Sequence, residues 1–222
     1  MEVLDGTTNV TNVCASSSHQ YPLQVWLASG ALVNNNLVIC GGVYPRTSSC
    51  YKFSHDHQWK SFAEMKTPRS GSASIPLPNG LWVTGGFGDG GKNLKSTEFV
   101  FSNGTSSTGP PLPEPRAGHC LLKYKETIFL IGGFNENKDD QSQVWIFRDE
   151  GMKFIGNGPG MNHVRSQHAC GIYQSPTHDG NPMIVVAGGN GSPETSEYWQ
   201  FTVPGSNWKT TSKSFAFLSF SK

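Results

Sequence analysis

The stretch Ile128-Phe129-Leu130-Ile131-Gly132-Gly133 is a short apolar run that ends in two glycines, and it decides the fold because it recurs. Four such runs occur along the chain. They are Leu37–Gly42, Leu81–Gly86, Ile128–Gly133 and Ile184–Gly189. The first glycines of successive runs are 44, 47 and 56 residues apart. Apolar runs repeating at such a period predict a repeat architecture built from β-strands.

Other features recur around each double glycine. A polar loop follows each pair, and then a strand rich in aromatic residues. These strands are Cys50–Phe53, Glu98–Phe101, Val144–Phe147 and Tyr198–Phe201. Trp59 and Trp208 occupy matching places further along the first and last repeats, and an arginine beside a small residue recurs at Arg69, Arg116 and Arg165. Each repeat therefore predicts a four-stranded sheet with two apolar faces, which must stack on neighbouring sheets to bury them.

This order of features resembles the kelch repeat, in which an apolar strand, Gly-Gly, an aromatic residue, Trp and Arg follow one another. The resemblance covers residues 21–210 and implies an all-β fold, a kelch-type β-propeller of about four blades. The stretches Val38–Gly42, Ser49–Tyr51 and His168–Gly171 look like those of extracellular kelch proteins of invertebrates.

The two ends of the chain depart from the repeat. Residues 1–20 form an N-terminal segment in which Glu2–Asp5 could be a ring-closing strand, and residues 211–222 form an atypical C-terminal strand or tail. Kelch propellers usually close with more than four blades. Three interpretations stay open, namely a partial propeller truncated from a longer ancestor, which we favour, a true four-bladed ring, and an open arc that self-associates.

Composition narrows the class of partner. The chain has 222 residues with 17 Lys and Arg against 16 Asp and Glu, a formal net charge of +1. Because phosphate binding needs a concentrated basic face, this balance argues against nucleic acid as the main partner. No apolar run is long enough to insert in a membrane, and the first six residues lack the pattern of a signal peptide.

Five cysteines, Cys14, Cys40, Cys50, Cys120 and Cys170, show no metal-binding spacing. Cys40 and Cys50 flank one inter-strand loop, so a disulfide between them is geometrically plausible, and the kelch resemblance supports it. Cys120 and Cys170 are predicted at equivalent places on the innermost strands of adjacent blades. Either a bridge near the axis or two buried thiols would fit there.

Two further sets of residues are candidate modification or site residues. Asn9, Asn103 and Asn190 begin N-glycosylation sequons, which a chain of this composition also produces by chance. His119 and His168 each follow an arginine by three residues, and they could be ligands or bases around the channel. Their periodic recurrence favours a structural role, in which arginine and histidine side chains hold the turns between blades.

Antiparallel connectivity places the loops after Gly-Gly and the connections between blades on one face. Exposed aromatic and arginine residues on variable loops are typical of binding surfaces. The candidate binding residues on this face are Tyr44, Arg46, Arg69, Phe87, Asp89, Lys92, Arg116, Phe134, Asn135, Glu136, Asn137 and Arg165.

These patterns favour a non-enzymatic module that binds a protein or glycan with this face, in an extracellular location, without a cofactor. One alternative is the substrate-recognition propeller of an intracellular ubiquitin-ligase adaptor, which would be cytoplasmic. Another is an enzyme similar to the copper-radical oxidase of this fold, although the required arrangement of Tyr, His and Cys is not evident.

Overall fold

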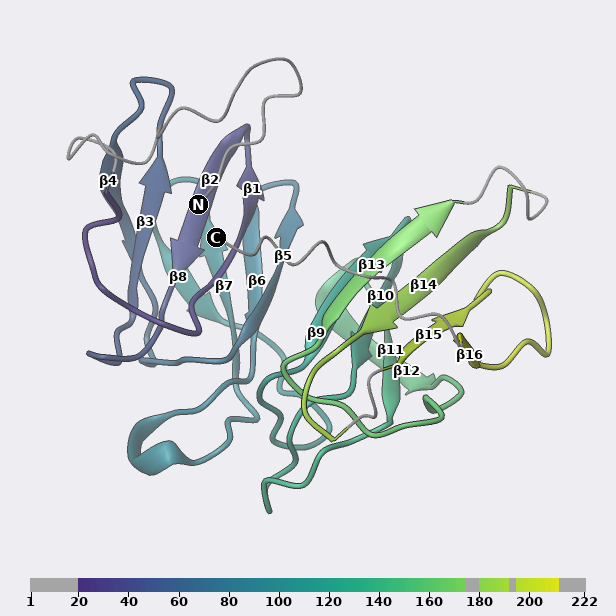
Figure 1. Cartoon of the computed structure of the whole chain (residues 1–222). Helices are drawn as coiled ribbons and strands as arrows, with labels where there is room; N and C mark the ends of the chain where they lie inside the picture. The colour runs from purple at the N-terminus through teal and green to yellow at the C-terminus, as the bar shows by residue number, and fades with distance from the viewer. Residues whose placement is uncertain (1–19, 175–179, 192–194, 212–222) are drawn as a thin grey trace, which may run out of the picture.

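A computed structural model describes residues 20–174, 180–191 and 195–211. The two terminal segments singled out in the sequence, residues 1–20 and 211–222, lie almost wholly outside these ranges. The described residues form sixteen strands in four antiparallel sheets of four strands each, in the order of the chain. Figure 1 shows the four sheets following one another from the purple end to the yellow end. The prediction of a four-bladed, all-β propeller is confirmed.

The strands of the four sheets have similar lengths. The first sheet consists of β1 (Ser29–Val33), β2 (Asn36–Cys40), β3 (Ser49–Phe53) and β4 (Trp59–Glu64). The second consists of β5 (Ala73–Leu77), β6 (Gly80–Thr84), β7 (Thr97–Phe101) and β8 (Ser106–Thr108). The third consists of β9 (Cys120–Tyr124), β10 (Thr127–Ile131), β11 (Val144–Arg148) and β12 (Lys153–Asn157). The fourth consists of β13 (Ala169–Gln174), β14 (Pro182–Ala187), β15 (Ser196–Trp199) and β16 (Lys209–Thr211).

Alternating residues of each second strand face opposite neighbours, because successive side chains of a strand point to opposite faces. In β10, Ile128 and Leu130 pack toward the second sheet, whereas Phe129 and Ile131 pack toward the fourth. The apolar core is therefore divided into three clusters, one at each junction between successive sheets. The repeated apolar run is the part of the sequence that supplies both sides of each cluster.

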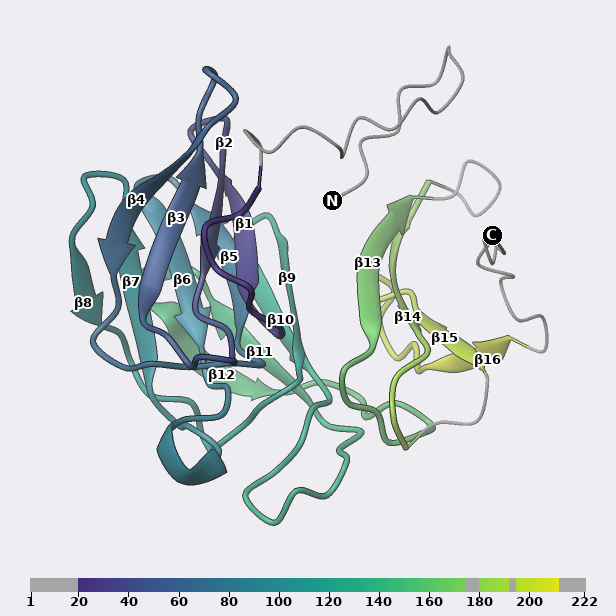
Figure 2. The same ribbon diagram turned by 60° about the vertical axis from the view of Figure 1, so that its left-hand side comes forward.

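The innermost strands β1, β5, β9 and β13 pack against each other in this order. A line of hydrogen bonds joins their entry segments, from the Gly71 nitrogen to the Leu27 carbonyl, from Gly118 to Gly71 and from Gln167 to Gly118, each 2.7 Å long. Strands β1 and β13 are not a packed pair of this kind among the described strands. Figure 2 shows the first and fourth sheets as the two ends of an arc.

The structure contains two disulfides, one for each pair of cysteines considered in the sequence. Cys40 and Cys50 are directly paired across β2 and β3 and form a disulfide, as predicted. Cys120 and Cys170 also form a disulfide, which joins the third sheet to the fourth. Their predicted equivalence was wrong by one residue, since Cys120 stands four residues after Arg116 and Cys170 five residues after Arg165. That offset turns the two side chains toward each other, because neighbouring residues of a strand face opposite ways.

Candidate binding face

The double glycines and the recurring arginines form one structural device. The nitrogen of Gly86 donates to the carbonyl of Arg116 at 2.8 Å, and corresponding bonds join Gly42 to Arg69 and Gly133 to Arg165. A side chain at Gly85, whose φ is +55°, would collide with the same arginine carbonyl. Glycine is required at this place because the backbone of the next repeat packs directly on the turn.

Each arginine side chain reaches forward to the turn of its own blade. The guanidinium of Arg69 donates to the carbonyl of Gly85 at 2.7 Å, that of Arg116 to Gly132 at 3.3 Å, and that of Arg165 to the Gly188 carbonyl at 3.0 Å. All three arginine side chains are fully buried. They were predicted as binding residues, and this part of the prediction was wrong. They hold two successive double-glycine turns together and so support the face from beneath.

The partner of each buried guanidinium varies along the chain. Arg69 pairs with the Glu98 carboxylate at 2.6 Å and Arg165 with Glu197 at 3.0 Å, both pairs being buried. At the same place in the third sheet stands Trp145, and the Arg116 guanidinium lies over its ring at 4.2 Å. Burial lowers the pKa of Arg116 to about 10 and also lowers that of Arg69, although Glu98 opposes the shift there.

The remaining predicted binding residues lie on or beside the loops that follow the double glycines. Asp89, Lys92, Glu136 and Asn137 are exposed, Arg46 and Asn135 are half-buried, and Tyr44 is 73% exposed. Phe87 and Phe134 are half-buried and lie side by side, with ring centroids 6.0 Å apart. These loops run along the lower side of the views in Figures 1 and 2.

Trp26 is a residue of this face that the sequence reasoning missed. Its side chain is 72% exposed, and its ring meets that of Tyr44 edge-on at 5.9 Å. Its backbone pairs with Val43, just as Ser70 pairs with Phe87 in the next blade. Trp26 therefore holds the place that follows the arginine in the other repeats, where small residues are buried. Among the described residues, the resulting aromatic pair is the most exposed apolar feature of the face.

The two periodic histidines differ in their surroundings. The Nε2 of His119 lies 2.7 Å from the Thr84 hydroxyl, which confirms a structural hydrogen bond between sheets. His168 faces the third sheet, where Ile131 replaces the threonine, and its ring nitrogens have no hydrogen-bond partner among the described residues. Burial, reinforced by the charge of the preceding arginine, lowers the pKa of His119 to about 3 and that of His168 to about 4. Both rings are therefore held neutral.

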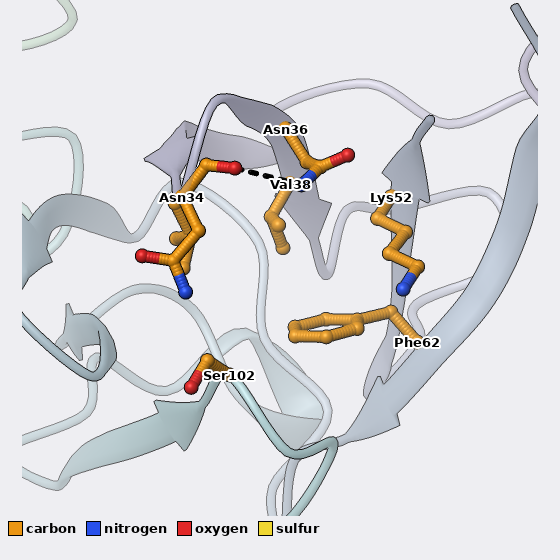
Figure 3. Close-up of a pocket in the computed structure, with 7 residues that line it drawn as sticks. Asn34, Asn36, Val38, Lys52, Phe62 and Ser102 are labelled. Atoms are coloured by element: carbon orange, nitrogen blue, oxygen red, sulfur yellow. Dashed lines mark hydrogen bonds between the residues drawn. The ribbon is translucent and has the colours of Figure 1, made fainter. Parts of the chain in front are cut away.

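Metal-binding side chains do not cluster in the described parts of the chain. No group of three or more His, Cys, Asp or Glu residues among the described ones is placed to hold a metal ion. No helix in these ranges is long and apolar enough to span a membrane. A recess at the opposite end of the first two sheets, near Val38, Phe62 and Lys52, has a volume of about 50 Å³ (Figure 3). That volume is below the range usual for small-ligand sites.

The sequence and the fold are similar to those of known kelch proteins. Kelch-like protein 41b of Danio rerio is 24% identical over 170 residues, which are 71% of this chain and 28% of that protein. Kelch-like protein 40 of Mus musculus is 23% identical over 88% of this chain and 32% of its own length. The solved structure of YjhT, a kelch-type propeller, superposes with a TM-score of 0.70 at 17% identity, covering 88% of this chain and 67% of that one. This chain has the fold of a kelch-type β-propeller.

The chain spans about a quarter to a third of the length of the curated relatives that it matches. A third relative, spermatocyte protein spe-26 of Caenorhabditis elegans, is 28% identical over 63% of this chain and 24% of that protein. No family model matches the sequence. The likeness to extracellular invertebrate kelch proteins is not tested by these relatives and stays a prediction.

Proposed function

We propose that this kelch propeller binds a protein partner with the face that carries the loops after the double glycines. The observation that carries the proposal is the aromatic pair Trp26 and Tyr44. Large aromatic side chains are the commonest anchors of protein interfaces, and they are rarely left in water without a role. Here both rings are more than two-thirds exposed on a rigid frame.

The frame beneath the face favours binding by a preformed surface. Arg69, Arg116 and Arg165 fix the turns from which the loops start, and Phe87 packs against Phe134 between them. A surface held in place loses little conformational entropy when a partner binds. Exposed groups of both signs, Asp89, Lys92 and Glu136 among them, lie on the loops of the second and third sheets on the same face and would supply polar contacts beside the aromatic anchors.

The test is a screen of immobilised protein against purified extracellular domains, with a glycan array in parallel. Each ligand found is then measured against two variants. Trp26→Ser with Tyr44→Ser removes the anchors, and Leu32→Ser removes a residue 64% exposed near the opposite end of the first sheet. We expect the first variant to lose at least tenfold in affinity and the control to bind normally. Equal binding by the wild-type protein and both variants would overturn the proposal. If ligands are found only on the glycan array, the proposed protein partner is wrong and the ligand of this face is a glycan.

We further propose that the protein works in an oxidising compartment, outside the cell. Two disulfides in one small propeller are the support, because disulfides are rare in the cytosol. The competing role is substrate recognition within an intracellular ubiquitin-ligase adaptor, and it rests on the likeness to Kelch-like proteins 40 and 41b. Intact mass of protein from its natural source, alkylated before and after reduction, separates the two. Four cysteines that alkylate only after reduction support the extracellular role, and alkylation without reduction supports the adaptor.

A further inference from the structure

The hairpin between β7 and β8 carries an N-glycosylation sequon in a defined conformation. Asn103, Gly104 and Thr105 form the tip of this turn, and the side chains of Asn103 and Thr105 are exposed. The Asn103 side-chain oxygen accepts two hydrogen bonds, from the Thr105 nitrogen at 3.0 Å and from the Thr105 hydroxyl at 2.7 Å. Gly104 has a φ of +87°, which glycine adopts without strain.

This arrangement leaves one amide group free for chemistry. Both hydrogen bonds occupy the oxygen Oδ1, and the nitrogen Nδ2 donates to no residue among those described. The bonds span only two residues, so the turn can form before the propeller has folded, as Asx-type turns do. The tip also lies at the end of the sheets opposite the candidate binding face, beside the recess of Figure 3 that Ser102 lines.

Asn190, the first residue of the last sequon, is held differently; Ser192 of that sequon lies outside the described residues. The Nδ2 of Asn190 donates to the side-chain oxygen of Gln167 at 3.0 Å, and its backbone is paired with Ser166 in both directions. These contacts join residues more than twenty positions apart, and a sugar on Nδ2 would remove the bond to Gln167. The sequon at Asn9 lies outside the described residues.

We propose that Asn103 is the acceptor of an N-linked oligosaccharide and that Asn190 is not. In the reaction, Nδ2 of Asn103 forms a bond to the first sugar carbon of a lipid-pyrophosphate-linked oligosaccharide. The bond from that carbon to the pyrophosphate oxygen breaks, the lipid pyrophosphate leaves, and the amide gives up one proton. The glycan then projects from the end of the propeller away from the binding face, so that both can operate together.

This inference rests on the extracellular location proposed above, and the experiment separates the two. The full chain is produced in eukaryotic cells behind an added cleavable secretion signal, which imposes the compartment. Purified protein is then weighed before and after peptide N-glycosidase treatment, and glycopeptides are mapped. We expect a glycan on Asn103 in most molecules, its loss in Asn103→Gln and in Thr105→Val, and an unchanged glycan mass in Asn190→Gln.

Conversion of Asn103 to heavy-oxygen-labelled Asp marks the occupied site where it requires the glycosidase and is absent from a sample incubated in the same water without the enzyme, because Asn103-Gly104 can also deamidate spontaneously. This readout does not depend on how well a variant folds. Unmodified Asn103 in the secreted wild-type protein would overturn the proposal, as would equal occupancy of Asn190. The location itself is judged on protein from its natural source, so its failure is distinct from failure at Asn103.

Discussion

Each of the buried arginines links two successive blades. Replacing one should lower the free energy of unfolding by an amount that depends on the group that the arginine leaves behind. In Arg69→Met, the carboxylate of Glu98 stays buried, only 2% exposed, without its cation. In Arg116→Met, the group left behind is the ring of Trp145, and a thioether packs well against an aromatic ring. Methionine roughly keeps the length and the apolar stem in both cases.

The magnitudes follow from these two environments. Breaking a buried ion pair by removing one partner costs about 3–5 kcal/mol. At Arg116 the loss is a cation–π contact, a hydrogen bond to the Gln143 side-chain oxygen at 2.8 Å and a 3.5 Å ion pair with Glu114, whose side chain is exposed and returns to water. Together these cost about 1–3 kcal/mol. We therefore expect Arg69→Met to lower the free energy of unfolding by about 2 kcal/mol more than Arg116→Met does.

Urea unfolding followed by tryptophan fluorescence measures both variants with the disulfides intact. Adding Glu98→Gln to Arg69→Met should recover part of the loss, because the remaining amide carries no charge. The exposed Lys92→Met provides a control that should change stability by less than about 0.5 kcal/mol. Equal losses in the two arginine variants, or no recovery by Glu98→Gln, would refute the assignment of these arginines as buried supports.

Three further outcomes follow from the structure. Because the pKa values of His119 and His168 are lowered in the folded state, the unfolded state takes up their protons first. The free energy of unfolding should therefore be unaffected by these two histidines above pH about 6.5. Below that pH it should fall by about 1.4 kcal/mol per pH unit for each histidine, down to about pH 4. Urea midpoints measured from pH 7 to pH 4 would show this decrease. Gly85→Ala should cost more than about 2 kcal/mol, whereas Gly90→Ala, whose new methyl group meets no atom within 4 Å, should cost about 1 kcal/mol by the same assay. The half-buried disulfide Cys120–Cys170 should be reduced at a lower reductant concentration than the fully buried disulfide Cys40–Cys50. Peptide mapping after stepwise alkylation would show the order, and simultaneous reduction would contradict it.

The repeat could be predicted from the sequence because its signals are local. An apolar run ending in Gly-Gly specifies a strand and a turn by itself, and four copies specify the stacking. The role of the arginines could not be predicted in this way. The carbonyl that receives the Arg69 guanidinium belongs to Gly85, sixteen residues away, and nothing near Arg69 indicates that its charge will be buried.

Trp26 was missed for a related reason. The first blade has Val25 at the place of the arginine, so a search for arginine did not find the entry segment. The signal that could have found it is the spacing, because Val25 precedes Gly41 by the same sixteen residues that separate Arg69 from Gly85. The first blade lacks both members of the buried ion pair. Val25 stands in place of the arginine, and Tyr51 stands in place of the glutamate and packs against Tyr21.

Hydrogen exchange of the amides, measured with and without the bound protein partner, tests the central claim most directly. The account predicts that binding protects peptides from residues 22–28, 43–48, 87–93 and 134–141, which belong to one face of the propeller. Peptides from the opposite end, such as residues 31–36 and 101–106, should exchange at unchanged rates. Protection confined to that opposite end would contradict the assignment of the binding face.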